Sequence, residues 1–64
     1  MTEDEAMELQ KGDKVQIVVS PNIYGHMYRF GDIDEVVRKG EERDNGIEIS
    51  LKRYYVHNMD IQRV

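Results

Sequence analysis

The sequence predicts an all-β domain in which about five short strands close, or nearly close, into a small barrel. Runs of β-branched residues alternate with polar residues, as in strands that bury one face. Turn-forming residues separate these runs at Pro21, between Gly40 and Gly46, and between His57 and Asp60. The chain has 64 residues and no cysteine. An open sheet of that size would bury too little surface and expose long edges, which favours closure.

An acidic arm, residues 1–10, precedes a single β-barrel domain predicted over residues 11–64. Thr2 and Glu5 are spaced as in a helix capping box, but few apolar side chains follow them. One or two helical turns are marginal without packing. We therefore expect either a flexible arm or a short helical turn, and the flexible arm is favoured because chain ends are usually mobile. Its removal should then leave the domain folded.

The first strand follows a Gly-Asp turn. Val15, Ile17 and Val19 recur at every second position, so they are predicted to share the buried face. Pro21 ends this strand because it has no backbone N–H to donate to a ladder. A long loop rich in aromatic residues follows.

The second strand is predicted to begin near Gly31, and neither of its faces is cleanly apolar. Ile33 and Val37 share a face with Glu35, which favours a bulge or a bend near this point. The next segment, residues 39–46, is polar and is predicted to be a turn.

The Asn45-Gly46 pair in that segment is a strong hairpin signal. Beyond it, apolar residues at every second position are predicted to face inward and the polar residues between them outward. The inward set is Ile47, Ile49 and Leu51, and the outward set is Glu48, Ser50 and Lys52. A last short strand through residues 61–64 follows the polar turn that begins at His57.

Two short motifs open the first two strands: residues 12–15 fit G-D-x-V, and residues 31–36 fit G-x-I-x-x-V. With these motifs and this strand order, residues 11–64 resemble the Src-homology-3-like barrels of prokaryotes and their phages. That superfamily includes the KOW-type domains of ribosomal and transcription proteins. The resemblance implies a one-turn helix at residues 57–60, just before the last strand. It also implies that the loop between the first two strands lies beside the hairpin loop and frames a binding groove with it.

Aromatic and basic residues gather in that loop and in a second run after Leu51, and they are the candidate binding residues. Tyr and Arg carry much of the energy of protein interfaces, and Met adds an adaptable contact. Phe30 is instead expected in the core, while for Tyr24 and Tyr28 packing and binding are equally expected. The candidate partner-binding residues are Tyr24, His26, Met27, Tyr28, Arg29, Tyr54 and Tyr55.

Catalysis is not expected. There is no cysteine nucleophile, and Ser20 and Ser50 have no His and acid at the spacing of a triad. His26 and His57 are expected to lie on the surface rather than to hold a metal. A barrel without a second layer is also expected to lack a pocket of the ~300 Å³ that small-molecule sites need. We therefore expect a non-enzymatic protein-interaction module without a cofactor, acting as a small subunit, regulator or inhibitor of phage type.

The net charge of −4 lies entirely in the arm, which holds four of the 13 acidic residues and no basic residue. Such an arm would attract a basic protein partner, and a neutral domain is a poor non-specific binder of nucleic acid. A KOW-like nucleic-acid contact through Arg29, Lys52 and Arg53 is thus the first alternative. A homo-oligomer paired through strand edges and the arm is the second. No apolar run reaches the ~20 residues of a membrane span, and the acidic N-terminus is unlike a signal peptide, so we expect a cytoplasmic protein.

Overall fold

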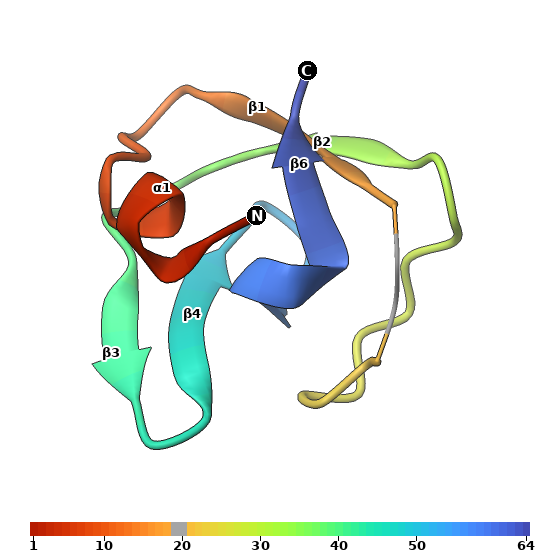
Figure 1. Cartoon of the computed structure of the whole chain (residues 1–64). Helices are drawn as coiled ribbons and strands as arrows, with labels where there is room; N and C mark the ends of the chain where they lie inside the picture. The colour runs from red at the N-terminus through yellow and green to blue at the C-terminus, as the bar shows by residue number, and fades with distance from the viewer. Residues whose placement is uncertain (19–20) are drawn as a thin grey trace.

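Two three-stranded antiparallel sheets account for most of the regular structure (Figure 1). The structure is a computed structural model, and it describes residues 1–18 and 21–64. The first sheet has the strand order β2-β1-β6 and the second has the order β3-β4-β5. The chain is therefore mostly β, as the alternating pattern predicted. In chain order the elements are α1 (Glu3–Met7), β1 (Lys14–Ile17), β2 (Ile33–Glu35), β3 (Glu41–Arg43), β4 (Gly46–Ser50), β5 (Tyr55–His57), the 3-10 helix η1 (Asn58–Asp60) and β6 (Ile61–Arg63).

Strand β1 lies in the middle of the first sheet, between β2 and β6. Its central residue Gln16 is opposite Ile33 in the antiparallel register with β2. Val15 and Ile17 are buried in the core, as their alternation predicted. Val19, the third residue of the predicted face, lies outside the described residues.

Strand β2 buries a different face from the one expected. Ile33 is 54% exposed, whereas Val36, just beyond the strand, is fully buried. Side chains alternate along an extended chain, so an inward Val36 sends Ile33 outward. Val36 forms an isolated antiparallel bridge with Leu51, and the N–H of Val37 donates to the carbonyl of Ser50 at 3.0 Å. The chain thus passes from the first sheet to the second at this point.

The predicted hairpin is present, with Asp44 and Asn45 in its turn and Arg43 opposite Gly46. Gly46 has a φ of 137°, and a Cβ there would lie 2.7 Å from the Oδ1 of Asn58, so a side chain is excluded. The expectation of a turn over the whole of residues 39–46 is wrong, because strand β3 occupies part of it. All three β3 residues are charged and exposed, which suits an edge strand.

Strand β4 and the residue that follows it, Leu51, supply three core side chains. Ile47, Ile49 and Leu51 are buried, as predicted. Ser50 was expected on the outer face but is also buried, at 8% exposed. Its hydroxyl accepts a hydrogen bond from the Nε of Arg38 at 3.1 Å, so the side chain is covered by the chain that follows β2.

The N-terminal segment forms the short helical turn and packs on the core. Thr2 and Glu5 make the predicted capping box, which begins α1. Ala6 and Leu9 are both 0% exposed, and α1 lies against β4. The amino group of Met1 donates to the carbonyls of η1 and β6, at 2.8 Å and 2.7 Å. The sequence favoured a flexible arm because the segment is marginal alone, and it is the tertiary packing that stabilises it here.

The long loop turns sharply just before β2, and this decides the position of Phe30. The N–H of Asp32 donates to the carbonyl of Arg29 at 3.0 Å, and Gly31 has a φ of 90°, which together describe a type II turn. Phe30 occupies the first central position of that turn and is 80% exposed. The expectation that Phe30 lies in the core is therefore wrong.

Helix η1 occupies the position that the resemblance implied, directly before the last strand β6. Asp60 caps it by accepting a hydrogen bond from the N–H of His57 at 3.1 Å. In the described part of the chain, no helix has both the length and the apolar character that crossing a bilayer requires.

Candidate functional site

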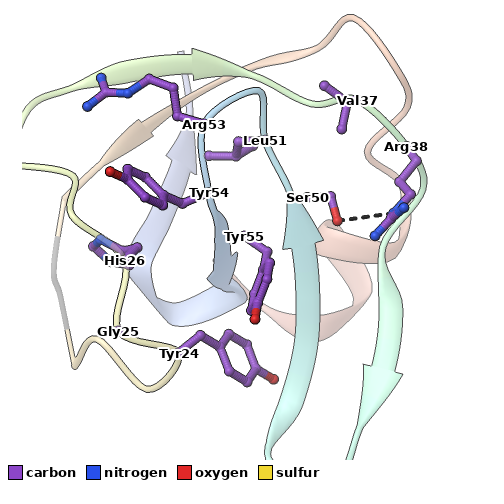
Figure 2. Close-up of a pocket in the computed structure, with 10 residues that line it drawn as sticks. All are labelled: Tyr24, Gly25, His26, Val37, Arg38, Ser50, Leu51, Arg53, Tyr54 and Tyr55. Carbon is purple, nitrogen blue, oxygen red and sulfur yellow. Dashed lines mark hydrogen bonds between the residues drawn. The ribbon is translucent and has the colours of Figure 1, made fainter.

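An open groove with a volume of about 400 Å³ lies where the long loop meets the ends of β4 and β5 (Figure 2). Tyrosine rings come from the loop and from the start of β5, and the arginines come from the β2–β3 and β4–β5 connections. Leu51 and Val37 add apolar surface. The expectation that so small a fold has no space above ~300 Å³ is therefore wrong. The tyrosines and arginines of the groove are Tyr24, Tyr54, Tyr55, Arg38 and Arg53.

Tyr24 and Tyr55 form one wall of the groove. Their ring centroids are 5.8 Å apart in an edge-to-face arrangement, which is the favoured geometry of aromatic pairs. The hydroxyl of Tyr24 donates to the Oδ1 of Asn45 at 2.6 Å, so the β3–β4 turn holds this ring in place. Partial burial, together with the carboxylate of Glu48, raises the pKa of Tyr24. Tyr24 therefore keeps its proton at neutral pH, while Tyr55 remains 51% exposed.

A partly buried hydrogen-bond network at Tyr54 positions the other wall. The hydroxyl of Tyr28 donates to Oδ2 of Asp34 at 2.5 Å and accepts from the N–H of Tyr54 at 3.1 Å. The same carboxylate oxygen accepts from the N–H of Arg53 at 3.3 Å. The short turn between β4 and β5 is thus fixed from below by a tyrosine and an aspartate that lie elsewhere in the sequence.

The network also shifts the pKa values of its two titratable members. Burial raises the pKa of Tyr28 to about 12, and the hydrogen bond to Asp34 acts in the same direction. Partial burial alone would raise the pKa of Asp34, but hydrogen bonds from Tyr28 and from the N–H groups of Glu35 and Arg53 lower it. At neutral pH the phenol is therefore a donor and the carboxylate is an acceptor.

The side chains of the two groove arginines contact aromatic rings and a hydroxyl group. The guanidinium of Arg53 lies 5.1 Å from the ring centroid of Tyr28 and 5.7 Å from that of Tyr54, within the range of cation–π contacts. Arg38 donates through Nε to Ser50, as the dashed line in Figure 2 marks. By contrast, Arg43 forms ion pairs with two glutamates on β3 and β4, at 2.6 Å and 3.2 Å.

His26 and His57 are buried, at 4% and 2% exposed, so the expectation that they lie on the surface is wrong. The Nδ1 of His26 accepts from the N–H of Tyr28 at 3.2 Å, which leaves the proton on Nε2, 3.3 Å from Oδ2 of Asp60. The Nδ1 of His57 accepts from the N–H of Met59 at 3.0 Å, so its Nε2 donates to the carbonyl of Asn45. Each ring thus ties the chain together through both of its nitrogens.

The structure brings together four of the seven predicted contact residues in the groove lining: Tyr24, His26, Tyr54 and Tyr55. Tyr28 is only 7% exposed and is not part of the groove lining. Its hydroxyl instead forms hydrogen bonds with Asp34 and with the backbone of Tyr54. Met27, at 70% exposed, and Arg29 are on the surface but outside this lining.

Sequence reasoning missed Arg38, and it placed Arg53 only in the nucleic-acid alternative. Arg38 lies near the end of the predicted second strand, where a lone cation carries no signal. Side chains that alternate between two faces along residues 53–56 would put Arg53 on the same face as Tyr55, and this pattern could have indicated its place in the groove. Within residues 1–18 and 21–64, no cluster of three or more His, Asp or Glu side chains could hold a metal ion.

Comparison of the chain with protein-family models, with curated proteins and with solved structures gave no match.

Proposed function

We propose that this chain is a non-enzymatic protein-interaction module that binds an extended segment of another protein in the groove of Tyr24, Tyr54, Tyr55, Arg38 and Arg53. The observation that carries the proposal is this pre-positioned set of three tyrosines and two arginines around an open space of about 400 Å³. In such a role the protein would act as a small subunit or as a regulator of its partner.

The chemistry of the groove suits a peptide. Tyrosine and arginine dominate the energetic centres of protein interfaces, because they bury a large area and keep a polar group for hydrogen bonding. The hydroxyl of Tyr24 is hydrogen-bonded to Asn45, and the N–H of Tyr54 is hydrogen-bonded to Tyr28. Both residues are therefore already ordered before a ligand binds. A binding site with ordered side chains gains affinity because less conformational entropy is lost.

We also propose that the two sheets form a bent, Src-homology-3-like barrel. The bridge between Val36 and Leu51 supports this, since it joins the end of β2 to the end of β4. If β2 and β3 are counted as two halves of one bent strand, the strand number becomes the five that the sequence predicted. Such a fold would frame the groove between its long loop and its β4–β5 turn.

Selection from a library of random, blocked peptides tests the proposed function. Immobilised wild-type protein should enrich peptide families whose binding falls at least about tenfold in Tyr55→Ala, a change at an exposed ring that removes contact area without opening the core. Tyr55→Phe is the companion variant and should keep most of the affinity. Arg43→Gln serves as a surface control outside the groove. Failure to enrich any family, or families that bind Tyr55→Ala as well as wild type, would contradict the proposal.

Single-stranded nucleic acid is the second candidate, and the cation–π contacts of Arg53 with two tyrosine rings favour it. Bases stack on exposed aromatic side chains, and guanidinium groups bind phosphates. Binding of an oligothymidylate, with an affinity that falls steeply as salt rises, is the expected behaviour for this candidate. The net charge of −4 weighs against it.

A further inference from the structure

The charged side chains that line the groove are all positive. The lining includes two arginines, Arg38 and Arg53, and no aspartate or glutamate. Neither arginine forms an ion pair within the part of the chain that the structure describes, whereas Lys14, Arg43 and Arg63 each have a carboxylate partner. The carboxylate of Asp34, outside the lining, interacts with the charge of Arg53, which helps to lower the pKa of Asp34. A lining whose charged side chains are all positive is complementary to a negatively charged ligand.

The donors of both guanidinium groups are also available. Arg38 uses only Nε in its hydrogen bond to Ser50, and within the described residues its two terminal amino groups make no hydrogen bond. Arg53 lies against the ring faces of Tyr28 and Tyr54, a contact that leaves its N–H donors at the edge of the guanidinium plane. Each arginine can therefore donate a pair of parallel hydrogen bonds to one carboxylate.

The two arginines stand at opposite ends of the groove, with Leu51 and Tyr55 between them in the view of Figure 2. The surface between the two cationic ends is therefore apolar and aromatic. A ligand that spans it needs an anionic group at each end and an apolar group in the middle.

We infer that the groove recognises an acidic peptide segment in which two carboxylate side chains flank an apolar or aromatic residue. This inference rests on the proposed function and names its ligand class. One carboxylate binds Arg53 and the other binds Arg38, while the central side chain packs against Leu51 and Tyr55. Neighbouring side chains of one face of an extended peptide are about 7 Å apart, so a short stretch of chain provides all three groups.

Peptide is favoured over nucleic acid by the number and placement of the cations. Affinity for a polynucleotide grows with each phosphate neutralised along a track of Lys and Arg, and this groove has two guanidinium groups separated by apolar surface. Lys52, the nearest lysine in the sequence to Arg53, is directed to Glu35 at 3.8 Å. The pattern matches paired carboxylates better than a row of phosphates.

The test uses three probes on the full 64-residue chain. The first is a blocked, fluorescein-labelled peptide with a central Glu-Ser-Phe-Ser-Glu sequence in a Gly-Ser context, which puts the two Glu side chains and the Phe on one face of an extended chain. The second has Gln-Ser-Phe-Ser-Gln in the same context, and the third is an oligothymidylate. Binding is measured by fluorescence anisotropy for the wild type, for Arg38→Gln, for Arg53→Gln and for the control Arg43→Gln, which removes the same charge outside the groove. Thermal unfolding of each variant reports whether it is folded.

We expect the glutamate peptide to bind at least about tenfold more tightly than the glutamine peptide. Arg38→Gln and Arg53→Gln should each reduce that affinity about five- to thirtyfold, and Arg43→Gln should leave it within about twofold. If Arg53→Gln does not fold, Arg53→Lys keeps a charge there and should still weaken binding, because a lysine cannot make the bidentate contact.

Equal binding of the two peptides would overturn the acidic ligand class and leave the proposed peptide-binding function standing. Loss of affinity in Arg43→Gln as large as in the groove variants would also overturn it, because the attraction would then be non-specific. Binding of the oligothymidylate alone would overturn both the inference and the proposed function.

Discussion

At the scale of single residues, the phenol of Tyr28 connects three parts of the chain that are far apart in the sequence. Its hydroxyl bonds the carboxylate of Asp34 on β2 and the N–H of Tyr54 ahead of β5, and its ring lies under the guanidinium of Arg53. From the sequence, packing and binding were equally expected for Tyr28. The alternation of buried and exposed side chains that identifies core residues in a strand does not apply in a loop. What decides it is the long-range partner Asp34, which no local signal could identify.

Replacing Tyr28 by Phe should destabilise the fold by about 1–2 kcal/mol, because it removes the hydroxyl from two hydrogen bonds and leaves a partly buried carboxylate and an N–H without this partner. Tyr54→Phe is the matched control, since this residue is 38% exposed and its hydroxyl makes no hydrogen bond among the described residues. Urea unfolding of both variants gives the comparison. Equal stability losses would mean that the network contributes nothing specific.

Stability should also fall as the pH rises from about 10 to about 12. The unfolded chain releases the phenolic proton of Tyr28 near its ordinary pKa of ~10, whereas the folded chain holds it to about 12. In that window the unfolded state binds fewer protons, so the free energy of unfolding decreases with pH. The stabilisation is complete below the lower value. Urea midpoints measured across this range should be flatter in Tyr28→Phe, and an unchanged slope would show that other groups cause the effect.

At the scale of elements, local patterns predicted β1, β4 and the turn at Asn45-Gly46 well, since each has alternation or a strong turn signal. Strand β3 was missed because an edge strand with three charged residues has no buried face to reveal it. Phe30 was misplaced because the type II turn around Gly31 directs it outward. For α1 the capping box was visible, but burial of Ala6 and Leu9 depends on the surface of β4, which exists only in the folded chain.

Leu9→Ala should cost about 2–5 kcal/mol, because it leaves a cavity at a fully buried position. A domain of this size has a total stability of only about 3–5 kcal/mol, so the variant should be largely unfolded at room temperature, and removal of residues 1–9 should unfold it as well. Glu3→Gln, at an exposed position of α1, is the control. Circular dichroism melts and amide dispersion in ¹H–¹⁵N spectra measure the outcome. A folded truncated chain would mean that α1 is an accessory tail after all.

At the scale of the whole molecule, the two ends of the chain are anchored very differently. The amino group of Met1 donates to the carbonyls of Asn58 and Ile61, and the side chain of Asn58 returns a hydrogen bond to the carbonyl of Met1 at 2.8 Å. Val64 at the other end is 71% exposed. One terminus therefore helps to close the structure between α1, η1 and β6, and the other extends away from it (Figure 1).

Acetylation of the amino group in the 64-residue chain should lower stability by about 1–2 kcal/mol, since an acetylated nitrogen keeps a single N–H where two carbonyls now accept. Amidation of the C-terminal carboxyl group is the matched modification and should change stability by no more than ~0.5 kcal/mol. Both peptides are short enough for chemical synthesis, and their thermal midpoints can be compared directly. Equal midpoints would show that the amino-terminal contacts add nothing to the fold.

The same asymmetry determines how the protein should be handled at the bench. A purification tag, a fluorophore or a surface linker placed before Met1 replaces the ammonium group with an amide and adds atoms beside η1. Measurements on such a fusion would therefore be made on a less stable fold. The same attachment after Val64 leaves those contacts untouched. Binding experiments on this protein should therefore carry their labels at the carboxyl end.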